Sequence, residues 1–80
     1  MRYYFDLQEC GKLIPDDEGR ELPDATAARD VALKEARTVM AAEVQEGRLC
    51  LACHIDVLDQ DRRPVLTLPF KQALAITGMA

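Results

Sequence analysis

The residues best suited to chemistry are two cysteines and a histidine in the segment Cys50-Leu51-Ala52-Cys53-His54. The segment matches C-x-x-C-H, the pattern that attaches c-type haem through two thiols and a histidine ligand to the iron. The alternation of apolar residues over 49–57, however, predicts a strand. Along a strand, Cys50 and Cys53 point to opposite faces, so both cannot reach one haem. We therefore expect no haem.

Zinc binding and thiol redox chemistry use the same residue types. A structural zinc ion needs four ligands, or three and a water, that converge from one side. The remaining thiol, Cys10, falls in a predicted turn, and there is no second Cys/His pair at metal-binding spacing. A thioredoxin-like pair would open a helix, and no helix is predicted after Cys53. The favoured interpretation is reduced thiols, with no metal site and no cofactor.

Catalytic dyads and carboxylate ion sites have weaker support. His54 beside Cys53 supplies a base and a nucleophile, but neighbours on a strand face opposite ways and cannot form a dyad. The cluster Asp16-Asp17-Glu18 offers carboxylates to a divalent cation, yet it lacks the alternating ligands of a calcium loop, so a solvated turn is favoured. The sequence has no phosphate-binding loop, nucleophile elbow or acid–base carboxylate pair. We therefore predict that the protein is not an enzyme.

Length and charge narrow the remaining classes. The 80 residues are 49% hydrophobic and 30% charged, which predicts one small folded domain over residues 1–80. Ten basic and fourteen acidic residues give a net charge of −4, which argues against nucleic acid or an anionic membrane as partner. Residues 1–24 hold 3 basic and 7 acidic side chains, so the excess lies in the first third. Without a signal peptide or a membrane-spanning run, we expect a cytoplasmic protein.

Strand and turn signals divide the chain into β-β-α-β-β. Alternation over 3–8 predicts a strand, and a turn over 9–12 returns the chain as a short strand at 12–14. Asp24 is a suitable N-cap for a helix over 25–46 that Gly47 ends. Residues 49–57 and 65–68 alternate as two further strands, and the prolines Pro64 and Pro69 around the second place it at a sheet edge. The final ten residues are apolar enough for a short helical turn.

These elements predict an α+β fold: a four-stranded antiparallel sheet in the order 2-1-3-4 with the helix on one face. The helix would pack through a stripe of mostly small residues, Ala25, Ala28, Ala32, Ala36, Val39 and Met40. The opposite face would mix polar and apolar side chains, namely Gln8 together with Tyr4, Asp6, Cys50, Ala52, His54 and Asp56. The last six form the candidate interaction face.

The chain opens with Arg2-Tyr3-Tyr4-Phe5-Asp6, and residues 16–24 lead into a helix that contains Ala27, Ala28 and Ala32. Together these stretches resemble a family of short bacterial proteins of the domain-of-unknown-function kind. Such proteins open as Arg2-Tyr3-Tyr4-Phe5-Asp6 does, and their middle runs D-x-E-G-x-E-L-x-D, as residues 16–24 do, into an alanine-rich helix. Residues 56–57 and 61–68 are similar to the family's closing hairpin, where a glycine commonly follows the second acid and Arg62 stands here. The resemblance implies no established activity or catalytic residue.

The sequence therefore favours a small non-enzymatic module that binds a protein partner or a second copy of itself. Contact would involve the candidate interaction face or the edge of the last strand. One alternative is a metal- or thiol-dependent small protein that uses Cys50, Cys53 and His54. A second is an antitoxin-like regulatory domain, because antitoxins of the HicB type also place an acidic glycine turn and a small-residue helix on an antiparallel sheet.

Overall fold

A computed structural model describes residues 1–9, 11–75 and 77–78. These residues form one α-helix, a short 3-10 helix and a five-stranded sheet. The elements in chain order are β1 Arg2–Glu9, β2 Lys12–Ile14, β3 Arg20–Glu21, α1 Ala25–Gln45, β4 His54–Leu58, β5 Pro64–Pro69 and the 3-10 helix η1 Phe70–Gln72.

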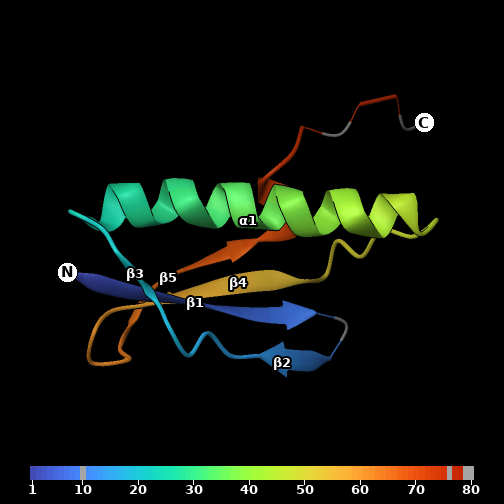
Figure 1. The fold of residues 1–80 in the computed structure, drawn as a ribbon. Helices are drawn as coiled ribbons and strands as arrows, with labels where there is room; N and C mark the ends of the chain where they lie inside the picture. Colours follow the sequence, from blue (N-terminus) through green and yellow to red (C-terminus); the bar gives the residue numbers. More distant parts are fainter. Residues whose placement is uncertain (10, 76, 79–80) are drawn as a thin grey trace.

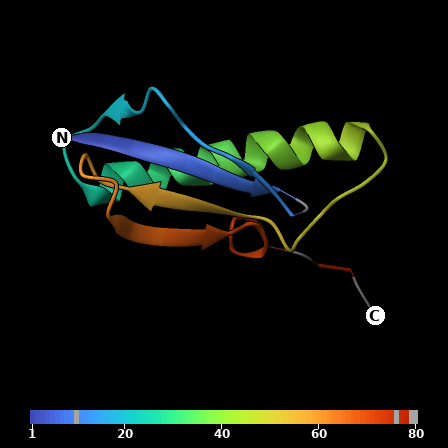
Figure 2. The ribbon, with the colours of Figure 1, turned by 90° about the horizontal axis from the view of Figure 1, so that it is seen from below.

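The strands pair antiparallel in the order β2-β1-β4-β5, and β3 pairs with β1 outside this path. β2 pairs with the end of β1 and β3 with its beginning, and the loop that joins β2 to β3 passes alongside β1 (Figure 2). The predicted class, an α+β fold with one helix and an antiparallel sheet, is confirmed for the described residues. The predicted four strands and their order differ in detail, because Arg20 and Glu21 add a two-residue strand opposite Tyr3 and Arg2.

Helix α1 begins and ends for the reasons that its sequence predicts. The Asp24 carboxylate accepts a hydrogen bond of 2.9 Å from the Ala27 backbone N–H, which satisfies one of the otherwise unpaired amides of the first turn. Gly47, just beyond the helix, has a φ of 85°, the left-handed conformation that glycine adopts without steric cost. Both boundary predictions are confirmed.

The helix packs through small residues, as predicted, but the buried set differs at its ends. Ala28, Ala32, Ala36 and Met40 are buried, whereas Ala25 at the first helical position is exposed. An unpredicted member, Glu43, is buried with an exposed fraction of 2%. Alanines allow the helix axis to approach the sheet closely, so this narrow stripe limits how much of the sheet one helix covers.

The helix covers β4 and β5 rather than the whole sheet. It packs against β4, β5 and η1, and Figure 1 shows β2 as the strand farthest from it. Ile55 and Val57 of β4 are therefore buried, while Phe5 and Leu7, their cross-strand neighbours on β1, are half-buried. The helix-facing side of the β1–β2 end of the sheet is left partly uncovered.

The predicted strand over 49–57 is wrong for its first part, because β4 begins at His54. Glu43 explains the difference. Its carboxylate accepts a hydrogen bond of 3.3 Å from the Cys50 N–H and another of 3.3 Å from the Arg48 guanidinium, and its backbone carbonyl accepts the Arg48 N–H. These contacts hold the chain against the end of α1 in a loop that turns at Leu51 and Ala52. The predicted C-terminal helical turn is the 3-10 helix η1, shifted to Phe70–Gln72, and residues 76, 79 and 80 lie outside the described residues.

Replacing Ala32 with Leu tests the helix–sheet packing. Ala32 is fully buried, so three added carbons must displace neighbours, and we expect the free energy of unfolding to fall by about 1–3 kcal/mol. Ala42→Leu adds the same atoms at an exposed helical position and should leave stability nearly unchanged. Chemical denaturation of both variants measures the difference, and equal unfolding free energies would show that α1 does not pack through Ala32.

Candidate functional site

The face of the sheet opposite the helix presents side chains in three rows that cross the strands. The strand registers define the rows, because directly paired residues point to the same face. The rows are ordered along β1, starting near its C-terminal end. They are Leu13–Gln8–His54–Pro69, then Asp6–Asp56–Thr67, then Tyr4–Leu58–Pro64. We call these ten residues the open face.

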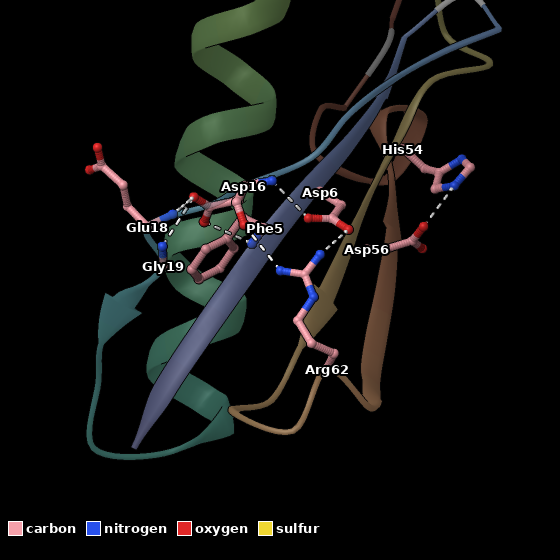
Figure 3. A network of polar contacts seen from close by, with 8 residues as sticks. All are labelled: Phe5, Asp6, Asp16, Glu18, Gly19, His54, Asp56 and Arg62. Carbon is pink, nitrogen blue, oxygen red and sulfur yellow. Dashed lines mark hydrogen bonds and ion pairs between the residues drawn. The ribbon is translucent and has the colours of Figure 1, made fainter.

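The middle row places two carboxylates directly opposite each other, Asp6 on β1 and Asp56 on β4. Like charges in this position destabilise a sheet unless each is compensated. Asp6 pairs with the Arg62 guanidinium at 3.2 Å. Asp56 accepts a hydrogen bond of 2.8 Å from the Thr67 hydroxyl, and its other oxygen lies 3.4 Å from His54 Nε2 (Figure 3). Asp6 is therefore paired with a cation, and Asp56 is hydrogen-bonded to Thr67 and lies beside His54.

Asp16 organises the loop that passes beside β1. One carboxylate oxygen accepts the Phe5 N–H at 3.1 Å, and the other accepts the N–H groups of Glu18 and Gly19 at 3.2 and 3.1 Å. The Asp16 N–H in turn donates to Asp6 at 2.9 Å. This loop lies between β2 and β3, so the side chain occupies the place where a strand would otherwise pair with Phe5.

Gly19 allows that loop to lie against β1. Its φ is 71°, and a Cβ built on it would lie 2.9 Å from the Tyr3 carbonyl oxygen. Both the left-handed backbone and the lack of space therefore require glycine at this position. The glycine in the stretch 16–24 of this chain therefore has a structural role.

Arg62 connects the β4–β5 turn to this loop. Figure 3 shows it reaching toward Asp6 and Asp16, and besides the Asp6 pair it donates a 3.1 Å hydrogen bond to the Asp16 carbonyl. Its guanidinium lies 4.7 Å from the centre of the Tyr4 ring, which adds a cation–π contact. Arg62 has a φ of 63°, a conformation that disfavours any residue with a Cβ.

The structure brings together four of the six predicted interaction residues. Tyr4, Asp6, His54 and Asp56 all lie on the open face. The placement of Cys50 and Ala52 there is wrong, because both precede β4 in the loop held by Glu43. Asp6 is also more buried than an accessible contact residue should be, with an exposed fraction of 8%.

The cysteine–histidine segment does not form a metal site in the described part of the chain. Cys53 is buried among core residues, and His54 lies on the open face beside Asp56. No group of three or more His, Cys, Asp or Glu side chains among the described residues could hold a metal ion. Cys10, the remaining thiol, lies outside those residues. The opposite-face argument from strand spacing fails, however, because Cys50 is not in a strand.

Asp16 and Arg62 organise this region, and neither role is predicted from the sequence. The acidic run at 16–18 predicts a solvated turn, yet the Asp16 carboxylate is hydrogen-bonded to three backbone N–H groups. The available signals are an aspartate three residues before a glycine, and an arginine in the segment between the last two predicted strands. Neither signal identifies the residue of β1 that the side chain contacts, which is Phe5 for Asp16 and Asp6 for Arg62.

No helix in the described part of the chain is long and apolar enough to cross a membrane. Among those same residues, every buried side-chain nitrogen and oxygen has a hydrogen-bond partner. No buried polar atom therefore points to a missing ligand.

Asp16→Ala tests the role of the loop carboxylate. The substitution leaves the Phe5, Glu18 and Gly19 N–H groups without their charged acceptor, so we expect the free energy of unfolding to fall by about 1.5–3 kcal/mol. Asp17→Ala, at the exposed neighbouring position, should change it by less than about 0.5 kcal/mol. Urea denaturation compares the two, and a similar effect of both substitutions would contradict the assignment.

Paired substitutions of Arg62 separate its backbone strain from its contacts. Arg62→Ala and Arg62→Gly both remove the contacts with Asp6, Asp16 and Tyr4, but only alanine keeps a Cβ in the left-handed conformation. We expect Arg62→Ala to be less stable than Arg62→Gly by about 1 kcal/mol. Thermal and urea unfolding measure this, and an alanine variant as stable as the glycine variant would show that the turn relaxes.

Comparison with known proteins places the chain in one family. The family model described as Domain of unknown function (DUF6894) matches residues 2–71, which covers every strand and the helix. No curated protein and no solved structure matches the chain. The predicted resemblance to a family of the domain-of-unknown-function kind is confirmed, and no function is assigned by it. The chain belongs to the DUF6894 family.

Proposed function

We propose that this protein is a non-enzymatic module that binds another polypeptide through the open face of its sheet. The supporting observation is that one face of the sheet has no helix of the described chain on it, while its charged groups are partnered in place. A partner that covers this face does not have to bury a carboxylate that lacks a hydrogen bond or an ion pair, because Asp56 accepts the Thr67 hydroxyl and Asp6 pairs with Arg62. The face is therefore suited to contact.

The open face carries both apolar and polar side chains that a protein partner can contact. Apolar or aromatic groups lie at its two ends, with Leu13 and Pro69 in one outer row and Tyr4, Leu58 and Pro64 in the other. Leu13 is 52% exposed, so its burial by a partner would remove substantial apolar surface from water. The polar middle row can give orientation through groups that still have free hydrogen-bonding capacity, such as the Thr67 hydroxyl.

The exposed edge of β5 is poorly suited to pairing with a strand of a partner protein. Proline lies at both ends of β5, at Pro64 and Pro69, and has no N–H to donate to a neighbouring strand. The β4–β5 register also shifts between Val57 and Leu58, an irregularity that twists an edge away from flat pairing. We therefore place the contact on the face.

A charge placed in the middle row tests this proposal. Thr67 is exposed and its hydroxyl bonds Asp56, so Thr67→Lys puts a long cation beside an existing carboxylate and should leave the fold intact. We expect the variant to lose self-association or partner retention by about tenfold or more, because the lysine must be displaced or buried on contact.

Thr38→Lys is the matched control. Thr38 is an exposed residue of α1, so the same substitution is made on an element that lies away from the open face. Sedimentation velocity over a range of concentrations measures self-association, and affinity capture from a lysate of the native host measures partner retention. Equal behaviour of wild type and both variants in the two assays, or equal loss in both variants, would refute the use of the open face.

A further inference from the structure

A second surface, on the helix side of the sheet, has the shape of a binding cleft. It has a volume of about 370 Å³ and lies between the β2–β3 loop, β1 and α1. Its apolar lining comes from Phe5, Leu7 and Ile14, and its polar lining includes Glu18, Arg20 and Glu35. The cleft exists because α1 packs over β4 and β5 and leaves the helix-facing side of β1 and β2 partly open.

The apolar side chains that line the cleft are partly exposed to solvent. Ile14 is 41% exposed although it lies opposite Leu7, on the side of the sheet that faces the helix. Phe5 and Leu7 pack against the core with one flank and remain half-buried. Covering these side chains would remove apolar surface from water, which is worth about 25 cal/mol for each Å².

The surroundings of the cleft are acidic. Asp16, Asp17 and Glu18 lie in the adjoining loop and Glu35 on the helix. Of the nearby bases, Arg2 and Arg62 donate hydrogen bonds to the Glu18 and Asp16 carbonyls, and Arg20 pairs with Glu35. Arg20 lies 3.8 Å from Glu35, but both side chains are about half-exposed, so this ion pair holds the two groups together only weakly. Glu18 and Glu35 therefore remain available to a cation that approaches the opening.

We propose that the cleft binds an extended segment of a partner protein that inserts one bulky apolar side chain between Phe5, Leu7 and Ile14. The charges require lysine or arginine two residues before and after this side chain, where side chains of an extended segment point the same way, so that the cations face Glu18 and Glu35. A volume of about 370 Å³ accommodates one large side chain, since it lies at the low end of ligand pockets, which span roughly 300–1,000 Å³.

The neighbouring strand favours an extended polypeptide as the occupant. β2 ends at Ile14, which lies on the wall of the cleft. Among the described strands, β2 pairs only with β1, so it lies at the edge of the sheet. Its outer edge can accept a further strand, which would supply backbone hydrogen bonds beside the cleft. This site is separate from the open face, because Ile14 and the open-face residue Leu13 are consecutive in β2 and point to opposite sides.

A synthetic peptide, acetyl-Thr-Lys-Thr-Phe-Thr-Lys-Thr-amide, is the probe for the test, because its lysines lie two residues from the phenylalanine and share its side in an extended chain. Titration into the ¹⁵N-labelled chain should give saturable changes in amide chemical shift that centre on residues 5, 7, 14, 16–20 and 35. Replacing the central Phe with Ala, or all the lysines with Glu, should weaken binding by about tenfold or more, because each removes one of the two recognition elements. No saturable shift, or equal affinity for the three peptides, would overturn the proposal.

Two neighbouring substitutions locate the site on the protein. Ile14→Thr shortens the cleft wall at an exposed strand position and should weaken the Phe peptide about tenfold, whereas Leu13→Thr makes a similar change on the open face and should leave its affinity unchanged. Amide spectra that match the wild type establish that both variants are folded. Equal weakening by both substitutions, or none by Ile14→Thr, would place the peptide elsewhere and overturn the proposal. Binding retained by Thr67→Lys separates this result from the test of the open face.

Discussion

The hydrogen bond from the Phe5 N–H to the Asp16 carboxylate is the interaction on which the other features of this sheet depend. β2 and β3 pair with the two ends of β1, so the centre of that edge has no strand beside it. A backbone N–H without a partner there would cost about 1–3 kcal/mol. Asp16 removes that cost with a side chain and thereby allows the chain to leave the sheet as a loop. The same loop forms one wall of the cleft and carries the Asp16 carbonyl that Arg62 binds.

The second constraint is the width of one alanine-lined helix against a wider sheet. A helix of about 10 Å diameter covers roughly two strands spaced about 4.8 Å apart. α1 accordingly packs against β4 and β5, which explains why Ile55, Val57 and Leu68 are buried while Phe5 and Leu7 are not. The cleft follows from this mismatch, because it is the part of the helix-facing side that the helix does not reach. The open face has a different cause, since the one α-helix of the described residues lies on the other side of the sheet.

Local signals in the sequence predicted the elements whose causes are local. The alternation of β1, the turn before Lys12, the Asp24 cap and the left-handed Gly47 each depend on neighbouring residues, and each is found in the structure apart from the turn residue Cys10, which is not described. β3 has no such signal, because two residues show no period. It forms where Gly19 turns the chain and where Glu21 pairs with Arg2 at 3.7 Å and with the N-terminal amine at 3.1 Å. The strand expected at 49–53 is absent for a similar reason, since Glu43 takes the Cys50 N–H from a position on the helix that alternation cannot reveal.

The candidate site also depends on contacts between residues that lie far apart in the sequence. It shows, in addition, which kind of surface can be predicted from the sequence. Strand parity placed Tyr4, Asp6, His54 and Asp56 on one face correctly, since parity depends only on the strands themselves. It could not show that Arg62 lies over Tyr4 and partners Asp6, because that contact joins residues 56 positions apart. Arg62 adopts a backbone conformation better suited to glycine, and a residue keeps such a conformation only when its contacts outweigh the strain. In this chain those contacts include an ion pair with Asp6, one of the two opposed carboxylates of the open face. A glycine at the same turn position would leave the Asp6 carboxylate without this cationic partner.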